Sequence, residues 1–396
     1  MKFFRLNEEV YFIPGSISSL YNLFTGEVYI IDKFDAEVLI KAEQGYDISN
    51  YENYDIFKKL ILKKMGKFYR SSVFIEKINL LPEWLNFIYF KPAPKINSVT
   101  ISLSKCKNNC LNCDGNIYRR FSPCFCNSKE VNDIDFLKNK DILELLVKLK
   151  KLGSQELIFL GSSSEDIDKE LIIKNALKLN FDSIKYIQCY KSLSDINYKE
   201  LGKLGAILYI QINYDEIGDS FLRKILSFDR KKFVVLIQAR YGLDKFDKVT
   251  EFFKKHKISY MIDYVFCNDT NKQEIFKLYN EINFKIDSQK FSVKRKYCSC
   301  LVGKFTILSN GDIVPCIGLK EFKVGNYINV NEIFTEKNLL KFWNLSSSKI
   351  NKCRDCGLRY ACNDCRSMEM KLGSTIDEKI SCIRPAIKCQ EKIENN

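Results

Sequence analysis

Histidine is almost absent from this sequence of 396 residues, in which His256 is the single instance. It stands in the basic segment 253–257, and we interpret it as an exposed surface residue. A single histidine excludes zinc fingers that combine cysteine with histidine, and it argues against histidine acid–base catalysis. Any metal binding or proton transfer must therefore depend on other side chains.

Long apolar runs are also missing. Runs such as 233–237 fall far short of the roughly 18 residues that a membrane-spanning helix needs. The segment that begins at Met1 reaches Glu8 and Glu9 before the apolar part of a secretory signal develops. We therefore expect a cytoplasmic protein with no membrane partner. In that reducing compartment clustered cysteines bind metals more often than they form disulfides, so the 16 cysteines indicate metal chemistry.

The composition is that of a folded, basic protein. Apolar residues make up 46% of the chain and its length suits two or three domains. The net charge of +14 is compatible with an anionic partner, either nucleic acid or peptide. The lysines are, however, spread over many amphipathic segments, so a solvated basic surface explains the charge equally well.

Three cysteines follow a strand-like segment at residues 96–103. They are Cys106, Cys110 and Cys113, in the spacing CxxxCxxC. A cubane iron–sulfur cluster usually takes four cysteine ligands, so a loop with three leaves one iron open to another ligand. A strand of an α/β fold delivers such a loop to the sheet edge where these folds bind ligands.

This spacing and the strand before it resemble those of the radical S-adenosylmethionine (SAM) enzymes. The resemblance implies that Cys106, Cys110 and Cys113 hold a [4Fe–4S] cluster whose open iron chelates SAM. It also implies that an electron from the cluster splits SAM into methionine and a 5′-deoxyadenosyl radical, which abstracts a hydrogen atom. The protein then binds and shields, while the cofactor supplies the difficult chemistry.

Strand-like and helical segments alternate through the middle of the chain. The helical segments include 130–152 and 171–179, and the strand-like segments are 96–103, 155–160, 184–189, 207–212, 233–238 and 259–264. This alternation predicts an α/β fold with a parallel sheet and right-handed crossovers. We expect a partial (β/α)6 radical SAM barrel.

The resemblance also indicates residues that contact SAM. In the families concerned, the second strand ends in a Gly-Gly-Glu motif whose backbone binds the SAM amino group. Here that place reads Gly161-Ser162-Ser163-Ser164-Glu165, in which Gly161 alone agrees, and we expect main-chain atoms of Gly161, Ser162 and Ser163 to take this role. A second departure is Asn112, which replaces the usual aromatic residue and affects an expected adenine contact.

Polar residues of the fourth strand occupy the place of the side chains that face the ribose of SAM in these families. They are Gln211 and Asn213. The alternative for Gln211 is an ordinary position on the face of the sheet. No catalytic acid or base can be identified from the sequence.

A second group of cysteines lies in the last hundred residues. Cys300 and Cys316 frame a Cx10Gx4C pattern around Gly311, and Cys298 precedes them. A CxxCx5CxxC quartet and a later cysteine follow: Cys353, Cys356, Cys362, Cys365 and Cys382. Two CxxC pairs form tight knuckles of thiolates that suit either zinc or an iron–sulfur cluster, and spacing alone does not choose between them.

This second pattern resembles the SPASM extension of radical SAM peptide maturases, which carries two further [4Fe–4S] clusters. The segments 352–356 and 359–362 are most similar to the grasp-with-spasm maturases. The interval between Cys362 and Cys365 is one residue shorter than usual. Family order implies two auxiliary sets: Cys300, Cys316 and Cys365 with Cys298 as candidate fourth ligand, and Cys353, Cys356, Cys362 and Cys382 with Cys389 as the alternative last ligand. If Cys298 does not ligate, an open iron is left that could bind a substrate thiolate.

The first ninety residues are predicted to form a small α+β module. Strand-like segments at 10–14, 19–24 and 27–31 precede helices at 32–42 and 54–65. Asp32 can cap the first helix, and Gly45 can close it. This order of elements resembles the PqqD-like module that binds leader peptides, and the alternative is a structural cap on the barrel. We expect domains at 1–90, 91–290 and 291–396, which would be the PqqD-like module, the barrel and the SPASM domain.

Together these patterns predict a radical SAM/SPASM enzyme that installs a thioether or carbon–carbon crosslink in a ribosomally synthesised precursor peptide. The expected partners are that peptide and an electron donor such as flavodoxin or ferredoxin. The alternatives are a formylglycine-type maturase, a zinc-ribbon protein that binds nucleic acid, and a scaffold without catalytic activity. The resemblance favours a peptide over nucleic acid.

Overall fold

The computed structural model describes most of the chain. The described residues are 1–51, 53–82, 96–103, 137–161, 167–192, 205–228, 233–240, 246–266, 284–335 and 337–382, with the backbone alone at 118–119, 240, 264 and 266. The segment 106–113 with its three cysteines lies outside these residues, as do Ser162, Ser163 and Cys389.

The chain forms two compact units, each assembled from separate stretches of sequence. One unit comprises Met1–Asn86, Phe276–Val302 and Trp343–Asn396, and the other comprises Phe87–Ile275 and Gly303–Phe342. Whether residues 1–90, 91–290 and 291–396 act as three functional domains stays a prediction.

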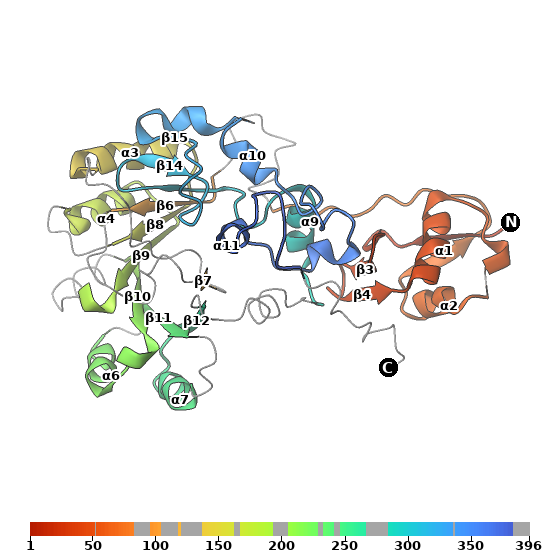
Figure 1. Ribbon diagram of the computed structural model, residues 1–396, viewed down its shortest axis with the longest axis horizontal. Coiled ribbons are helices and arrows are strands. Elements are labelled where there is room, and N and C mark those ends of the chain that lie inside the picture. Colours follow the sequence, from red (N-terminus) through yellow and green to blue (C-terminus); the bar gives the residue numbers. More distant parts are fainter. Residues whose placement is uncertain are drawn as a thin grey trace. The chain divides into compact units, whose positions relative to one another are not determined.

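The second unit is built on a ten-stranded sheet in its described part (Figure 1). Its central strands run parallel and in chain order: β6 (Ser98–Ser102), β8 (Glu156–Leu160), β9 (Ser183–Cys189), β10 (Ile207–Asn213), β11 (Phe233–Arg240) and β12 (Tyr260–Phe266). The alternation of strands and helices predicted from the sequence is thereby confirmed, while the curvature of a partial barrel stays a prediction.

Short strands extend this sheet on both sides. Beyond β6 lie the parallel β13 (Lys304–Ile307) and the antiparallel β14 (Asp312–Val314) and β15 (Gly325–Asn326). Beyond β12 lies the antiparallel β7 (Tyr118–Arg119). The sequence had not indicated β13 to β15 as part of the sheet, because their residues come from the cysteine-rich C-terminal region.

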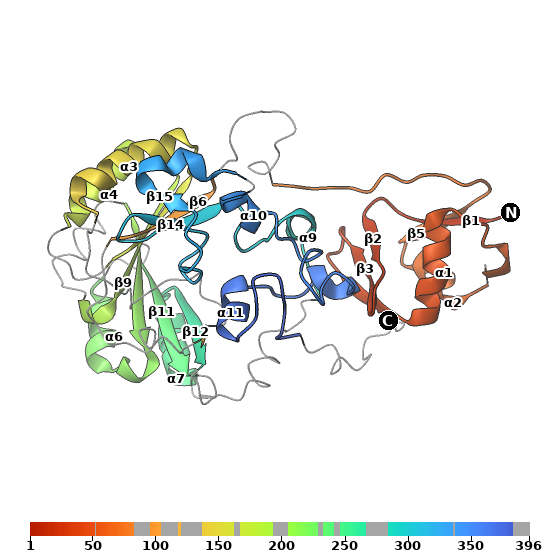
Figure 2. The same ribbon diagram turned by 45° about the horizontal axis from the view of Figure 1, so that its top comes forward.

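Helices cover one side of the sheet, as Figures 1 and 2 show. They are α3 (Asn139–Lys151), α4 (Lys169–Lys178), α6 (Asp219–Leu226) and α7 (Asp247–Lys255). Residues paired across parallel strands point to the same face. On one face of the sheet, Leu160, Ile187 and Leu236 pack with Leu308 and Val314 in an apolar cluster.

The N-terminal part of the first unit contains two small antiparallel sheets. One pairs β1 (Phe3–Leu6) with β5 (Gly66–Tyr69), and the other has the order β2 (Val10–Ile13), β3 (Ser18–Asn22) and β4 (Val28–Ile31). Helices α1 (Lys33–Gln44) and α2 (Asp55–Leu62) complete it, with η1 (Ser49–Tyr51) between them. The predicted strands and helices are present, and β1 was not predicted.

Helix α1 begins and ends at the residues that the sequence indicated. The Asp32 side chain accepts a hydrogen bond from the Asp35 amide, 2.9 Å away, which satisfies an amide of the first turn. Gly45 ends the helix with a φ of 87°, a left-handed conformation that glycine adopts at little cost. Phe4, Leu39 and Phe57 belong to the apolar core that this helix covers.

The C-terminal stretches of the first unit are mostly short turns and helices. They include α9 (Ser288–Lys296), η6 (Gly357–Tyr360) and α11 (Arg366–Lys371). Elsewhere the described chain has η3 (Tyr190–Ser192), η4 (Tyr214–Glu216), η5 (Tyr327–Ile333) and α10 (Leu339–Trp343). A second apolar cluster joins β2 and β3 to this region through Tyr21, Phe291, Cys356 and Leu358.

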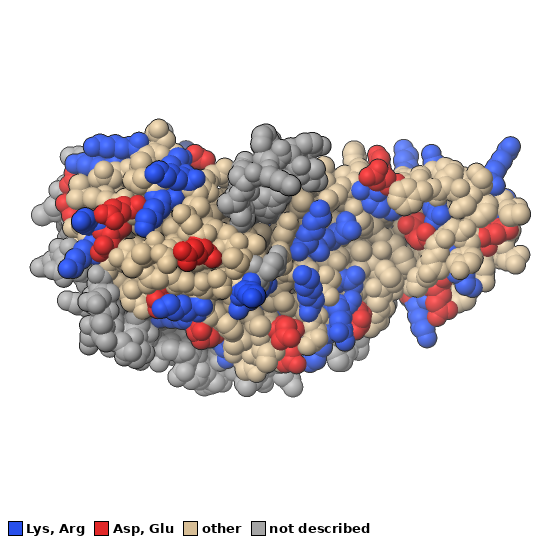
Figure 3. Space-filling model, turned by 90° about the horizontal axis from the view of Figure 1, so that it is seen from above, with Lys and Arg blue, Asp and Glu red and all other residues tan. Residues whose placement is uncertain are grey.

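The surface is mixed in charge. Figure 3 shows lysine and arginine scattered over the face in view, with acidic residues among them. This distribution agrees with a solvated basic surface. Among the described residues, no helix is both long enough and apolar enough to span a bilayer.

Removal of the α1 cap should destabilise the N-terminal module. We expect Asp32→Ala to lower the free energy of unfolding by about 1 kcal/mol, because an amide of the first turn loses its acceptor. Asp32→Asn is the matched control, since asparagine caps equally well, and it should unfold like the wild type. Urea unfolding of the full chain followed at the N-terminal module checks this, and equal losses in both variants would contradict the role of the cap.

Candidate metal centre

The described cysteines of the C-terminal region are thiols that form no disulfide. This holds for all eight that the sequence analysis placed in the auxiliary sets: Cys298, Cys300, Cys316, Cys353, Cys356, Cys362, Cys365 and Cys382. Cys316 belongs to the unit with the large sheet, and the other seven belong to the unit with the N-terminal module. The finding agrees with the expectation that these residues bind metal.

The structure brings the second predicted set close together. Burial raises the pKa of the Cys353 thiol to about 12, and the negative charges of Cys362 and Cys382 add to that rise. The pKa of Cys362 is raised by burial and, in the same direction, by Cys356 and Cys382. Each of the four thiols therefore lies within electrostatic reach of others in the set, although they are up to 29 positions apart in the sequence (353 to 382).

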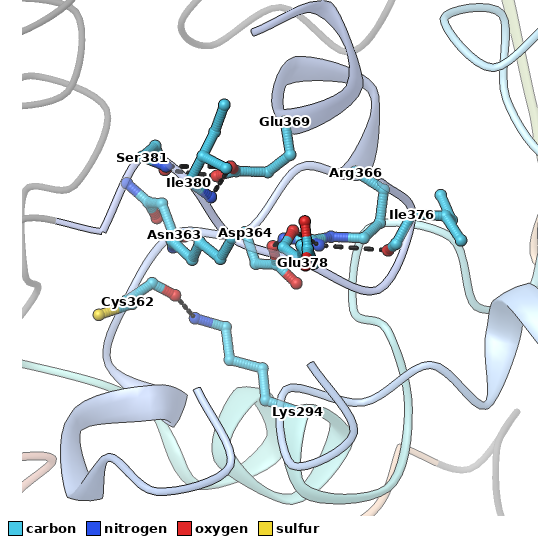
Figure 4. Close-up of polar contacts among 11 residues, drawn as sticks. Lys294, Cys362, Asn363, Asp364, Arg366, Glu369, Ile376, Glu378, Ile380 and Ser381 are labelled. Atoms are coloured by element: carbon cyan, nitrogen blue, oxygen red, sulfur yellow. Dashed lines mark hydrogen bonds and ion pairs between the residues drawn. The ribbon is translucent and has the colours of Figure 1, made fainter. Parts of the chain in front are cut away.

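A buried lysine and a half-buried lysine lie beside these thiols. Lys379 is 2% exposed and its Nζ donates to the Asn363 carbonyl at 2.5 Å. Burial lowers its pKa, but Cys362, Asp364 and Cys353 outweigh that effect and the net shift is upward. Lys294, from α9, donates to the carbonyls of Tyr360 and Cys362 at 3.0 and 2.9 Å (Figure 4).

The lysines fit the chemistry of the donor set. Thiolate ligands give an iron–sulfur cluster a negative charge, and nearby charge and burial tune its potential. A buried cation needs a negative partner to offset its lost hydration. The thiols, once ionised on a metal, supply that partner to Lys379, so the residues present suit a thiolate-bound metal group.

A buried arginine and a buried glutamate connect the chain around Cys365 to the chain that leads to Cys382 (Figure 4). Arg366 is fully buried; it forms an ion pair with Asp364 and donates to the Glu378 carbonyl at 2.7 Å. Glu369, also fully buried, accepts from the amides of Ile380 and Ser381 at 3.0 and 3.2 Å.

These contacts fix the place of the last cysteine. Glu369 also accepts a hydrogen bond from the Ser381 hydroxyl, so three donors of residues 380–381 meet a single carboxylate. Cys382 follows directly. Sequence reasoning missed Arg366 and Glu369, because a charged residue in a short helix carries no signal of burial.

The four cysteines of the first predicted set all lie within the described residues. Cys298 is buried; its amide donates to the Trp343 carbonyl at 2.8 Å, and its carbonyl accepts from Val302 at 2.9 Å. Burial, followed by the charge of Asp364, raises the pKa of its thiol to about 12. Cys300 and Cys365 are partly exposed in the same unit. The joint site with Cys316 stays a prediction.

As the thiols are placed, no group of three or more histidine, cysteine, aspartate or glutamate side chains within the described ranges surrounds a single metal ion. The four thiolates of a cubane bind four different irons, whereas those of a zinc site share one ion. The residues therefore suit a cluster because the thiols lie close enough to affect one another electrostatically, without surrounding one ion.

Polar side chains occupy paired positions on three neighbouring strands, in a row that begins at the carboxyl end of β10. Asn213 of β10 pairs in register with Gln238 of β11, which pairs with Asp263 of β12. All three are buried, as is Gln211 one step back on β10. Because in-register residues of parallel strands share a face, these side chains form a row on one face of the sheet.

This row fits a polar ligand. Gln211 Nε2, Asn213 Oδ1 and Gln238 Oε1 have no hydrogen-bond partner among the described residues, whereas Asn213 Nδ2 donates to Glu216 at 2.7 Å. Buried polar atoms are rarely left without partners, so such atoms suit a bound polar molecule. Gln238 and Asp263 were missed from the sequence, because their place beside Asn213 depends on the register of the strands.

Gly161 follows β8 and must be glycine for a packing reason. Its amide donates to the Ile187 carbonyl at 2.9 Å, and a Cβ at this position would collide with the ring and hydroxyl of Tyr186. The roles of Gly161, Gln211 and Asn213 in SAM binding stay predictions. Those of Ser162, Ser163, Cys106, Cys110 and Cys113 fall outside the described residues.

Comparison with solved structures gives weak likenesses. The crystal structure of Streptococcus suis SuiB bound to precursor peptide SuiA is 16% identical with a TM-score of 0.44, over 97% of this chain and 100% of that chain. The structure of histidine-tagged anSMEcpe with bound AdoMet is 15% identical with a TM-score of 0.46, over 69% of this chain and 90% of that chain. With TM-scores below 0.5 they carry no argument. No curated protein matches the sequence.

Removal of the Glu369 charge should loosen the segment before Cys382. We expect Glu369→Gln to cost about 2 kcal/mol locally, and the amides of residues 380 and 381 to exchange about 30-fold faster, because a charged acceptor is lost in a buried place. Hydrogen exchange measures this. Glu378→Gln is the control, since that exposed side chain lies in the same segment. Equal exchange in the two variants would contradict the account.

A family model matches part of the cysteine-rich C-terminal region. Residues 298–357 match SPASM, described as an iron-sulfur cluster-binding domain. The match contains Cys298, Cys300, Cys316, Cys353 and Cys356, and it confirms the SPASM region that the cysteine spacing indicated. This part of the chain is therefore similar to the SPASM iron–sulfur cluster-binding domains.

Proposed function

We propose that this protein is a radical SAM peptide maturase. It would cleave SAM at a cluster held by Cys106, Cys110 and Cys113 and install a thioether or carbon–carbon crosslink in a ribosomally synthesised precursor peptide. The observation that carries the proposal is the SPASM match at residues 298–357 in a chain whose CxxxCxxC motif follows the first strand of a parallel α/β sheet.

The sheet supports this proposal because β6, the strand that precedes the motif in the sequence, lies in the same parallel sheet as the polar row. The motif follows β6 in the sequence, and Gly161 follows β8. Asn213 is the last residue of β10, and Gln238 of β11 and Asp263 of β12 continue its row in register. Ligands of parallel α/β sheets bind at the carboxyl ends of the strands. When bound there, the cluster and SAM supply a radical that abstracts hydrogen from the substrate.

The chain's own residues would bind, orient and exclude water. Gln211 and Asn213 present unpaired amide atoms that suit the ribose hydroxyls. Leu160, Ile187 and Leu236 lie on the same face and keep water away, which a reactive radical requires. The auxiliary clusters held by the C-terminal cysteines would accept the electron released when the crosslink closes.

The N-terminal module would bind the leader of the precursor peptide. Support comes from its three-stranded antiparallel sheet with two helices, the element order of a PqqD-like module. An extended peptide adds to a sheet edge through backbone hydrogen bonds. Glu27 and Val28 at the start of β4 already meet residues 284–285, so β2 and the rest of β4 are the edges that remain in the described sheet. An electron donor such as flavodoxin or ferredoxin completes the system.

A formylglycine-type maturase is the second candidate. Such an enzyme needs an acid or base near the radical, and the sequence did not identify one. Asp263 is a buried carboxylate in the polar row at the sheet edge and meets this need. The two candidates differ in product: a crosslinked peptide in the first, an aldehyde in the second.

The cofactor content tests the proposal directly. Anaerobically purified protein should be brown, absorb near 400 nm and contain about twelve irons per chain, because three cubanes carry four each. Cys106→Ala should lose SAM cleavage to 5′-deoxyadenosine, whereas Cys124→Ala, a cysteine outside all three sets, should keep it. A colourless zinc protein whose nucleic acid binding falls steeply with salt would support the zinc-ribbon alternative instead.

The polar row can be tested through SAM affinity. Asn213→Ala should raise the Kd for SAM about tenfold, since one buried hydrogen bond is lost. Asn175→Ala is the matched control, because this asparagine of α4 bonds only to the Leu171 carbonyl of its own helix. Equilibrium dialysis with labelled SAM gives both constants, and equal values would remove Asn213 from the site.

A further inference from the structure

The hairpin of β2 and β3 is hydrogen-bonded to the CxxC segment of the second cysteine set, residues 353–357. The Ser16 amide and hydroxyl both donate to the Asp355 carbonyl, at 2.6 and 2.8 Å. The Gly357 amide donates to the Ile17 carbonyl at 2.6 Å. These bonds join backbone groups on either side of Cys356 to a loop that lies about 340 residues earlier in the sequence.

The contact is so close that two glycines are required. A Cβ on Gly357 would lie 2.5 Å from the Ile13 carbonyl oxygen and 2.7 Å from the Ser19 amide nitrogen. A Cβ on Gly15 would lie 2.6 Å from the Asp355 carbonyl oxygen. Distances under about 3 Å are repulsive, so neither position accepts a side chain unless the hairpin and the CxxC segment move apart.

A buried tyrosine forms a further hydrogen bond between the hairpin and the CxxC segment. The Tyr21 hydroxyl, on β3, donates to the Gly357 carbonyl at 2.8 Å, and the side chain has no exposed surface. Its ring packs on Phe291 and Tyr360 with centroids 4.7 and 6.1 Å away. Burial raises the pKa of Tyr21 well above its usual value, and Cys362 acts in the same direction, so this hydroxyl lies within reach of a second cysteine of the set.

We propose that the β2–β3 hairpin is a positioning element for the iron–sulfur cluster of Cys353, Cys356, Cys362 and Cys382. This inference depends on the assignment of those cysteines as cluster ligands. The hairpin holds the carbonyl of Asp355 and both backbone groups of Gly357, so the thiol of Cys356 between them can take few positions. The N-terminal module is then part of the cluster site as well as a peptide-binding element.

This arrangement links the cluster and the hairpin in both directions. A contact that favours cluster binding is itself stabilised when the cluster binds, by the same free energy. Iron removal should therefore loosen residues 10–22 more than the part of the N-terminal core that Phe4, Leu39 and Phe57 form. A peptide that binds to the same sheet would therefore change the stability of the bound cluster through these contacts.

Iron content and spectroscopy of a glycine variant test the inference. Gly357→Ala should lose about four irons per chain and one set of cluster signals in electron paramagnetic resonance, since one cubane carries four irons. Gly218→Ala is the matched control, because nothing lies within 4 Å of a Cβ there and its φ is −119°. It should keep the full iron content.

A milder variant covers the case in which Gly357→Ala fails to fold. Tyr21→Phe keeps the ring but leaves the Gly357 carbonyl unpaired, so it should keep all the iron and shift the midpoint potential of one cluster alone. A tenfold change in its reduction equilibrium is about 59 mV for one electron. Hydrogen exchange of residues 10–22 should also rise several-fold when iron is removed from the full-length wild type.

The outcomes separate the inference from the cluster assignment. Full iron content and unchanged spectra in Gly357→Ala, together with an unchanged potential in Tyr21→Phe, would overturn the role of the hairpin alone. A wild-type protein that carries no iron on the C-terminal cysteines would overturn the assignment of the ligands, and the inference with it.

Discussion

The architecture of the C-terminal region depends on the pairing of buried charges around a group of thiols. Arg366, Glu369 and Lys379 are almost completely buried, and an unpaired charge in such a place is strongly destabilising. Asp364, the amides of residues 380–381 and the cysteines supply the partners. A short segment with few apolar residues is thereby fixed, and the ends of the second cysteine set are brought together.

The large sheet follows a different constraint, in which parallel strands place their carboxyl ends at one edge. Apolar residues fill one face beneath that edge, and the polar row of Asn213, Gln238 and Asp263 stands at its rim. A ligand bound there meets hydrogen-bonding groups on one side and a dry surface on the other. This combination suits chemistry that must exclude water.

Local patterns in the sequence predicted the parts of the structure that local forces determine. The six central strands, the cap at Asp32 and the left-handed Gly45 follow from periodicity and from the chemistry of helix ends. The hydrogen bonds of Ser16 and Tyr21 to residues 355–357 were not predictable, because they join chain segments about 340 positions apart. Nor was the burial of Arg366 and Lys379, since charged residues normally lie at the surface. The row at the sheet edge required the register of β10 to β12, which spacing alone does not give.

The central claim is that one chain holds three iron–sulfur clusters, of which one binds SAM and two are auxiliary. The most direct measurement is electron paramagnetic resonance of the anaerobic, reduced protein before and after SAM is added. The account predicts that the signal of one cluster changes on addition of SAM, because one iron is open, and that the signals of the SPASM clusters stay as they were. A spectrum that is identical with and without SAM, or the absence of any iron–sulfur signal, would contradict it.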